Sequence, residues 1–487
     1  MNPFLIGLDI GTTSTKAVAF DLEGNTLAQH SVGYAYFQPK EDRREQNPEE
    51  IFTAVVEVLS TVRKKVEQTH LLAGVSFSSV MHSLMLVDEK GLPLTNLITW
   101  ADNRSVEEAD ALNASGSGLD FYKINGTATH PMSPLCKLLW FKKNEPKLFE
   151  KAYKFIGIKE FVFYHLTGQF IIDTSVASAT GLFDIHNLSW SQEILDYIGI
   201  SPERLSEPVS PFHVTNSCST FHESVKNTLL VTGANDGCLA NLGAGAIQKG
   251  SLAITVGTSA AVRLTTNNPL IDAQARTFCY HLADNYYISG GATNNAGDVL
   301  GWYVKNFMNR GSNAYQRFFK EIIKIDAGSE GLLFLPYLLG ERSPHFNAKA
   351  RGVYFGISAY HNKSHFERAT VEGISYALRD ITEVLIEASG ISVENIIVGG
   401  GVTKQTAWLQ LMADVLNRPL ILNDVIEHSA YGAVKIGMKA LGFISDFKDI
   451  KEAQIKQTFY PNPQNREVYD KGFAKFRRLY QVLKEEF

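Results

Sequence analysis

Apolar and polar positions alternate in short runs over the first 35 residues, which is typical of a β-hairpin. A turn is expected at residues 21–25. A helix should follow, because Asn47 is a suitable N-cap, Pro48 suits the first helical position and Glu49 and Glu50 fill the first turn. Apolar residues then recur at helical spacing up to residue 66.

Further along, residues 72–78 and 84–87 have the short apolar runs of buried strands. The polar segment Met81-His82-Ser83 lies between them. Residues 133–145 and 146–168 are each expected to be helical.

Two segments far apart in the chain share one pattern. Residues 5–18 and residues 252–263 each contain an apolar strand, a Gly-Thr turn and a second strand. Aligning Gly11 with Gly257 pairs Thr12 with Thr258. The repeat predicts two related domains that face one nucleotide, with a boundary near residue 245.

A third glycine loop, residues 399–401, follows a buried strand and precedes a helix with one apolar face. Such a unit suits a nucleotide, because a helix N-terminus favours anions; the alternative is a loop that only needs a positive φ. The stretch from Tyr469 to Phe487 is expected to be a packed amphipathic helix.

The chemistry of the first turn favours an anion. Gly11 lets the backbone approach closely, Thr12 and Thr13 add hydroxyl donors, and Lys16 adds a positive charge. Asp9 can hold a hydrated magnesium ion beside that anion. The turn does not have the sequence of a Walker phosphate-binding loop. The alternative interpretation is a tight hairpin with a polar tip and no bound anion.

Composition narrows the class of protein. A chain of 487 residues is too long for one core, and its 45% hydrophobic and 20% charged residues are ordinary for a soluble globular protein. A net charge of −5 does not indicate nucleic-acid binding. We expect neither a secretory signal nor a membrane span, and hence a cytoplasmic protein. The four cysteines are scattered and form no C-x-x-C pair, which argues against a zinc site and against a disulfide framework. They are Cys136, Cys218, Cys238 and Cys279.

Two longer patterns carry a resemblance to a known family. Residues 132–144, and residues 352–357 with 365–372, resemble the two signatures of the FGGY family of carbohydrate kinases. The resemblance implies an α/β fold of two ribonuclease-H-like domains, of the actin and heat-shock-ATPase type, around an interdomain ATP cleft. It assigns residues 1–245 to sugar-acid binding and the catalytic base, and residues 246–487 to nucleotide binding. Family habit also suggests a homodimer.

Within the family, the chain is similar to gluconate kinases in four short segments: residues 77–83, 98–105, 130–134 and 177–182. The resemblance therefore implies transfer of a phosphoryl group from ATP to D-gluconate, giving 6-phosphogluconate. A xylulokinase or another sugar kinase of the family is the alternative. A nucleotide-binding regulator of the same fold is a second alternative, and a dehydrogenase is disfavoured because no G-x-G-x-x-G follows a strand.

The resemblance also implies the site residues. Asp236 matches the catalytic base, which would accept the proton of the terminal hydroxyl and could also contact the metal. Asp9 would contact Mg²⁺ through water. The expected ATP-binding residues are Asp9, Thr12, Thr13, Lys16, Gly257, Thr258, Gly400, Gly401 and Lys404. The expected acceptor-binding residues are Met81, His82, Asp102, Asn103, Arg104, Lys159 and Asp236.

A sugar carboxylate calls for a cation in the acceptor pocket. Arg104 offers two parallel hydrogen bonds, and Lys159 or His82 offers a single charge. The alternatives are a structural salt bridge for Arg104 or Lys159 and a core position for His82.

Overall fold

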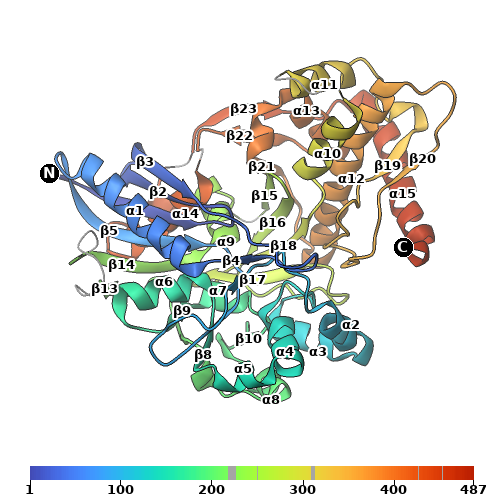
Figure 1. Cartoon of the computed structure of the whole chain (residues 1–487). Coiled ribbons are helices and arrows are strands. Elements are labelled where there is room, and N and C mark those ends of the chain that lie inside the picture. Colours follow the sequence, from blue (N-terminus) through green and yellow to red (C-terminus); the bar gives the residue numbers. More distant parts are fainter. Residues whose placement is uncertain (218–225, 249, 309–312, 426, 452) are drawn as a thin grey trace. The chain divides into compact units, whose positions relative to one another are not determined.

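The computed structural model describes residues 1–217, 226–248, 250–308, 313–425, 427–451 and 453–487 (Figure 1). Cys218 therefore lies outside the described residues; Cys136, Cys238 and Cys279 are buried free thiols. The chain divides into two units, described separately below. Unit 1 comprises Met1–Gly245, Thr266–Ile288 and Glu427–Glu452, and unit 2 comprises Ala246–Thr265, Ser289–Ile426 and Ala453–Phe487.

Unit 1 is built on a sheet with the strand order β13-β14-β5-β1-β2-β3. Strands β1, β2 and β3 are antiparallel, which confirms the hairpin predicted at the start of the chain. Strands β5 and β14 run parallel to β1 and to each other, and β13 is antiparallel at the edge. The bounds are β1 Asn2–Ile10, β2 Ser14–Asp21, β3 Thr26–Gly33, β5 His70–Ser79, β13 Val214–Asn216 and β14 Leu229–Asn235.

Helices cover both faces of this sheet. Helix α1 (Pro48–Val66) begins as predicted, since the Asn47 side chain accepts a hydrogen bond from the backbone N–H of Glu49. Side chains alternate between the two faces of a strand: Leu8 joins the core under α1, whereas Gly7 faces α14 (His428–Ala440). A Cβ on Gly7 would lie 2.1 Å from the carbonyl oxygen of Ala430, so only glycine allows this helix to pack so closely.

One sequence-based prediction in unit 1 is wrong. Residues 146–168 do not form one helix, because strand β8 (Lys154–Ile156) separates α5 (Pro146–Lys151) from α6 (Ile158–Thr167). Strand β8 pairs with β6 (Met85–Val87), and its Phe155 is buried in the core. Pairing with a distant strand overrides the local helical preference, and Gly157 then starts the next helix as its N-cap.

The other elements of unit 1 lie outside this sheet. Among them, α4 (Pro134–Asn144) confirms the helix predicted at residues 133–145. The remaining bounds are β4 Glu45–Gln46, β7 Leu97–Ile98, α2 Val106–Ser115, α3 Ser117–Asn125, β9 Ile171–Asp173, α7 Thr174–Ser178, β10 Phe183–Asp184, β11 Ser189–Trp190, α8 Gln192–Ile198, β12 Glu207–Val209, α9 Asp236–Ala244 and β17 Phe278–Ala283.

Six neighbouring strands of the second sheet repeat this topology, in the order β18-β16-β15-β21-β22-β23. Strands β15 and β16 form an antiparallel hairpin, β21 and β22 follow in parallel, and β23 closes the edge antiparallel. Each strand thus has a counterpart in unit 1: β15 matches β1, β21 matches β5, and β22 matches β14. This correspondence confirms the predicted α/β class and the relation between the two halves. The bounds are β15 Ser251–Val256, β16 Ala260–Thr266, β18 Tyr286–Thr293, β21 Asn395–Gly399, β22 Leu420–Asn423 and β23 Ile455–Phe459.

The core of unit 2 forms between this sheet and its helices. Helix α12 (Lys363–Ser389) buries residues along most of its length, and α13 (Thr406–Leu416) buries the apolar face predicted from the sequence. The remaining bounds are α10 Gly297–Phe307, α11 Ala314–Ile322, β19 Leu333–Leu335, β20 Val353–Phe355 and α15 Arg466–Leu483.

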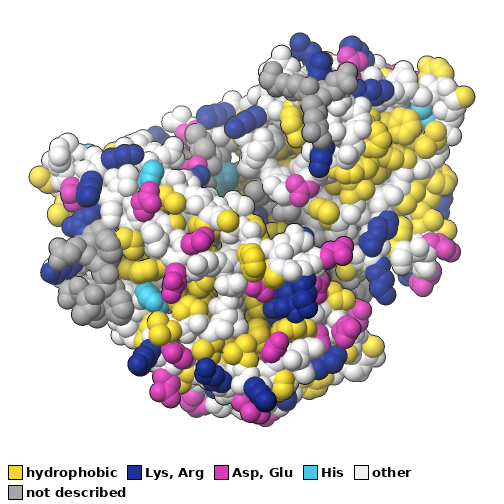
Figure 2. Space-filling model, in the orientation of Figure 1, with side chains coloured by type: hydrophobic (Ala, Val, Ile, Leu, Met, Phe, Trp, Pro, Cys, Tyr) yellow, Lys and Arg dark blue, Asp and Glu magenta, His cyan; other side chains and the backbone are white. Residues whose placement is uncertain are grey.

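The surface is mixed in charge. On the face drawn in Figure 2, acidic and basic side chains are interspersed, in keeping with the net charge of −5. Within the described residues, every helix is too short or too polar to traverse a lipid bilayer.

Candidate active site

The first glycine loop joins β1 to β2 and brings three charged side chains together. Asp9 and Lys16 are cross-strand partners in the hairpin. Asp9 accepts a hydrogen bond of 2.7 Å from the Ser78 hydroxyl on β5, and burial raises the pKa of its carboxyl group. Lys16 Nζ lies 2.8 and 2.9 Å from the two carboxylate oxygens of Glu427, just before α14. The sequence did not suggest Glu427, which lies 411 positions away from Lys16.

The same loop contacts the segment that carries Asp102. Trp100 Nε1 donates a hydrogen bond of 3.0 Å to the Thr12 hydroxyl. Gln46 Nε2 donates a bond of 2.8 Å to the Thr12 carbonyl oxygen. Thr13 is exposed, and its carbonyl oxygen accepts a bond of 3.2 Å from the backbone N–H of Tyr34. The predicted phosphate loop and the predicted acceptor segment are therefore in direct contact within unit 1.

Met81 and His82 follow strand β5, at the same edge of the sheet. His82 is buried and has a φ of 66°, a left-handed conformation that is uncommon outside glycine. Its Nε2 lies 3.2 Å from the hydroxyl oxygen of Tyr280 on β17, which belongs to unit 1. Met81 is half-buried.

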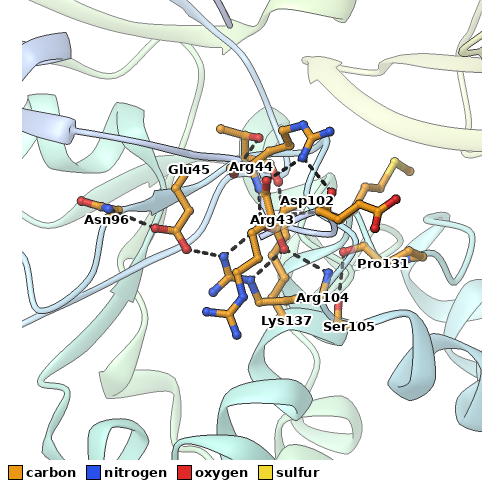
Figure 3. A network of polar contacts seen from close by, with 12 residues as sticks. Arg43, Arg44, Glu45, Asn96, Asp102, Arg104, Ser105, Pro131 and Lys137 are labelled. Carbon is orange, nitrogen blue, oxygen red and sulfur yellow. Dashed lines mark hydrogen bonds and ion pairs between the residues drawn. The ribbon is translucent and has the colours of Figure 1, made fainter. Parts of the chain in front are cut away.

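Asp102 and Arg104 are bound to each other (Figure 3). The Arg104 Nε and Nη2 atoms lie 2.8 and 2.9 Å from the two carboxylate oxygens of Asp102, and Nη2 also lies 2.5 Å from Glu45. Asp102 further accepts a bond of 2.7 Å from the backbone N–H of Arg44, whereas Asn103 is exposed. Arg104 therefore forms a structural salt bridge, which was the alternative to a contact with the sugar carboxylate. Since these bonds use Nε and Nη2, they leave only its Nη1 group for a ligand.

Lys159 lies at the start of α6 and is also in an ion pair. Its Nζ lies 2.6 Å from a carboxylate oxygen of Asp173 and 3.2 Å from the carbonyl oxygen of Ala234. The side chains of Lys159 and Asp173 are 4% and 0% exposed. Burial lowers the pKa of Lys159, while the charges of Asp173 and Asp236 act in the opposite direction. Lys159 therefore anchors the end of strand β14, two residues before Asp236.

Asp236 is the first residue of α9 and is half-buried. It is not the helix cap, because Asn235 caps α9 through a bond of 2.8 Å from the backbone N–H of Cys238. Asn235 is itself held by Ser175, whose hydroxyl and carbonyl oxygens lie 2.9 and 3.1 Å from Asn235 Nδ2. The neighbouring residue thus performs the capping, and Asp236 Oδ1 accepts a bond of 2.7 Å from the N–H of Gly237.

In unit 2, the second hairpin loop leaves Gly257 and Thr258 exposed. Their carbonyl oxygens accept bonds of 3.0 and 3.1 Å from the backbone N–H groups of Gly297 and Asp298, at the start of α10. The loop is therefore held by backbone hydrogen bonds, and the N–H of Gly257 is also bound, since it donates to the carbonyl oxygen of Ser259 at 2.9 Å.

The third glycine loop, also in unit 2, requires glycine at one position. Gly400 has a φ of +87°, and a Cβ there would lie 2.4 Å from the carbonyl oxygen of Val256. Gly401 has more room, since its nearest contact would be 3.9 Å away. Lys404 is exposed at the end of the short 3₁₀ turn Gly401–Lys404.

The residues of unit 1 that sequence reasoning missed share one property: they act through contacts between distant segments. No local spacing signals such contacts. They are Arg44, Glu45, Lys137, Asp173, Ser175, Tyr280 and Glu427.

Comparison with known proteins identifies the family of the chain. The profile of the FGGY family of carbohydrate kinases, N-terminal domain, matches residues 4–243, and that of its C-terminal domain matches residues 252–441. A gluconokinase from Bacillus subtilis (strain 168) is 38% identical over an alignment of 501 positions, which covers 100% of this chain and 97% of the relative.

Two solved structures from Lactobacillus acidophilus match equally well. One is a gluconate kinase and the other a ligand-bound xylulose kinase. Each is 34% identical, has a TM-score of 0.95, and covers 99% of this chain and 98% of its own. With both domain profiles matched and a full-length relative above 30% identity, this chain belongs to the FGGY family of carbohydrate kinases.

Proposed function

We propose that the protein transfers the γ-phosphoryl group of Mg-ATP to D-gluconate and forms 6-phosphogluconate. The main support is the full-length similarity to a gluconokinase, at 38% identity. In unit 1, residues predicted to bind the substrates or act in catalysis lie at the ends of three strands. Asp9 lies near the end of β1, before the first glycine loop, His82 follows β5, and Asp236 follows β14. Neighbouring parallel strands bring such groups to one edge of the sheet.

Asp236 is the proposed base. It accepts the proton of the terminal hydroxyl and orients the oxygen for in-line attack on the γ-phosphorus. A loose transition state depends more on positioning than on a strong base, and the position of Asp236 is set by the buried contacts of Asn235 and Lys159.

The chain's own residues suit a nucleotide and a magnesium ion. Thr12, Thr13 and Lys16 in unit 1 and the exposed loop of Gly257 and Thr258 in unit 2 provide donors for phosphate oxygens. Gly400, Gly401 and Lys404 are assigned to the adenosine side.

For the metal, no cluster of three or more His, Cys, Asp or Glu side chains occurs among the described residues. Magnesium usually takes one or two carboxylates plus water and phosphate oxygens, so Asp9, acting through water, with Asp236 as a second carboxylate fits that chemistry. The ion would offset negative charge on the phosphates.

Recognition of the acceptor is assigned to the segments of His82 and Asp102. Asn103 is exposed and can bind sugar hydroxyls. The gluconate carboxylate would meet the Nη1 edge of Arg104, because Nε and Nη2 are bound to Asp102 and Glu45. The carboxylate of a sugar acid would therefore meet an arginine whose charge is partly neutralised by Asp102 and Glu45.

That neutralisation favours a second candidate, a xylulokinase. Two of the three cations expected to meet a carboxylate, Arg104 and Lys159, lie in buried ion pairs. The xylulose kinase structure also matches the chain as well as the gluconate kinase structure does.

The test is a coupled ADP-release assay with purified protein, Mg-ATP and gluconate, xylulose, ribulose, glycerol or no sugar. We expect gluconate to give the highest kcat/KM. A higher value for xylulose would replace gluconate by the second candidate and keep the kinase assignment. ADP release that does not depend on any sugar would contradict both.

A further inference from the structure

Lys137 is a buried lysine to which the mechanism above gives no role. It lies on α4, within the first family signature, and its side chain is fully buried. Its Nζ donates three hydrogen bonds to backbone carbonyl oxygens: 2.6 Å to His82, 2.8 Å to Thr99 and 2.8 Å to Met132. Figure 3 shows Lys137 beside the ion pair of Arg104 and Asp102.

The three carbonyl groups come from three segments that are far apart in sequence. Two of these segments carry residues assigned to the acceptor: His82 itself and the loop from Thr99 to Arg104. The third, the loop that precedes α4, is bound to the second, because the Ser105 hydroxyl donates to the carbonyl oxygen of Pro131 at 3.1 Å. An ammonium group has three N–H donors and no acceptor, so its donors match these three carbonyl groups one to one.

The contact with His82 fixes an unfavourable conformation. A non-glycine residue in the left-handed region costs about 1–2 kcal/mol and persists only where its surroundings impose it. Here the carbonyl oxygen of His82 is held by Lys137, and its ring lies against Tyr280. The ring is thereby held at the end of β5, beside Met81.

We propose that Lys137 is a positioning residue for the sugar acceptor: its ammonium group sets the spacing of these three segments, and so controls acceptor affinity without touching the sugar. This rests on the proposed function only in placing the acceptor at His82 and Asp102. The three hydrogen bonds involve none of the residues assigned to the nucleotide, although Trp100, next to Thr99, donates to the Thr12 hydroxyl. The effect should therefore fall mainly on the acceptor.

The pH dependence of acceptor KM provides a readout that a structural lysine without influence on the acceptor would lack. Deprotonation of Lys137 leaves two N–H donors for three carbonyl groups. Burial lowers the pKa of Lys137 to about 7; Asp102 and the thiol of Cys136 oppose this effect, and Arg104 adds to it. Acceptor KM should therefore rise as the pH increases through about 7, while ATP KM should not follow it.

The experiment compares Lys137→Met with wild type and with Lys435→Met. Lys435 is a matched control, because it is also a buried lysine of unit 1, and its Nζ donates to a single carbonyl oxygen, that of Leu242, at 3.0 Å. We expect Lys137→Met to raise acceptor KM at least about tenfold, the effect of losing about 1.4 kcal/mol of binding. ATP KM should change less than twofold, and Lys435→Met should show no such selectivity.

A folded Lys137→Met variant whose acceptor KM stays within twofold of wild type, or whose two KM values rise together, would overturn the proposal. If that variant does not fold, calorimetric titration of wild type with the acceptor from pH 6 to 9 decides, and a constant affinity contradicts the proposal. The acceptor used is the sugar with the highest kcat/KM in the panel above. A preference for xylulose therefore overturns the gluconate assignment and leaves the Lys137 measurement intact.

Discussion

The two sheets have the same strand order, yet their corresponding strand ends carry different groups. Strand β14 of unit 1 ends at Asn235 and is followed by Asp236; its counterpart β22 of unit 2 ends at Asn423 and is followed by Asp424. Asp236 is half-buried at the start of a helix. Asp424 is exposed, and its side chain accepts a bond of 2.9 Å from the backbone N–H of Gln454.

The two hairpin loops differ in the same way. The position two residues before the loop glycine is Asp9 in unit 1 and Thr255 in unit 2. The unit 1 loop is flanked by the charged side chains of Asp9 and Lys16 on its two strands, whereas the unit 2 loop is fixed by backbone hydrogen bonds to α10. The repeated topology provides equivalent strand ends, and side chains decide which of them can carry chemistry.

The largest expected effect separates the two aspartates. Asp236→Asn should lower kcat by about 10³-fold, because general-base catalysis contributes about 10²–10⁴ and the amide cannot accept the proton. Steady-state ADP release measures the loss, and circular dichroism checks that the fold persists. Asp424→Asn is the matched control and should stay within twofold of wild type. Near-normal turnover in Asp236→Asn would exclude Asp236 as the base.

A buried ion pair in unit 1 and an exposed pair in unit 2 form the next contrast. Lys159→Met should destabilise the protein by about 3–5 kcal/mol, because it leaves the Asp173 carboxylate buried without its partner. Lys324→Met removes an exposed partner of Glu321 and should cost less than about 1 kcal/mol.

Urea unfolding measures both variants. If Lys159→Met costs no more than Lys324→Met, the pair does not anchor the strand end before Asp236.

The lysines assigned to the nucleotide should also differ between the units. Lys16→Met should raise ATP KM about tenfold, because a phosphate contact worth about 1.4 kcal/mol is lost. Lys404→Met should raise it only a few-fold, since Lys404 is exposed. Acceptor KM is the internal control for both variants. An unchanged ATP KM in either variant would remove that lysine from the nucleotide site.

The smallest effect concerns pH and two buried carboxyl groups, Glu160 in unit 1 and Glu341 in unit 2. Burial raises the pKa of each to about 7 from 4.5. The folded protein therefore holds protons that the unfolded chain has released, and stability falls as the pH rises from about 4.5 to 7. Glu160→Gln and Glu341→Gln should each raise Tm relative to wild type by a few degrees more at pH 8 than at pH 5.

Calorimetric melting at the two pH values measures this difference. Glu150→Gln, at an exposed position, should show none. A gain that is equal at both pH values would mean that the carboxyl groups do not titrate in this range.

Local features of the protein were determined by the sequence alone. The cap at Asn47, the hairpin around Gly11, its repeat at Gly257 and the glycine turn at Gly400 all depend on neighbouring residues, so each could be predicted from a short window. The family signatures likewise lie in continuous segments, which is why the kinase family could be inferred before the structure. The assignments of individual site residues remain predictions.

Only the tertiary structure decided how these features meet. Strand β8 forms inside a segment with a helical pattern because β6 provides its pairing partner. The sequence left Arg104 and Lys159 open between contact with a carboxylate ligand and a structural salt bridge, and the structure has both in buried pairs with Asp102 and Asp173. Lys137 acquires its three carbonyl partners from segments up to 55 positions away. A buried charge must find compensation wherever the fold places it, and contacts over such distances leave no periodic trace in the sequence.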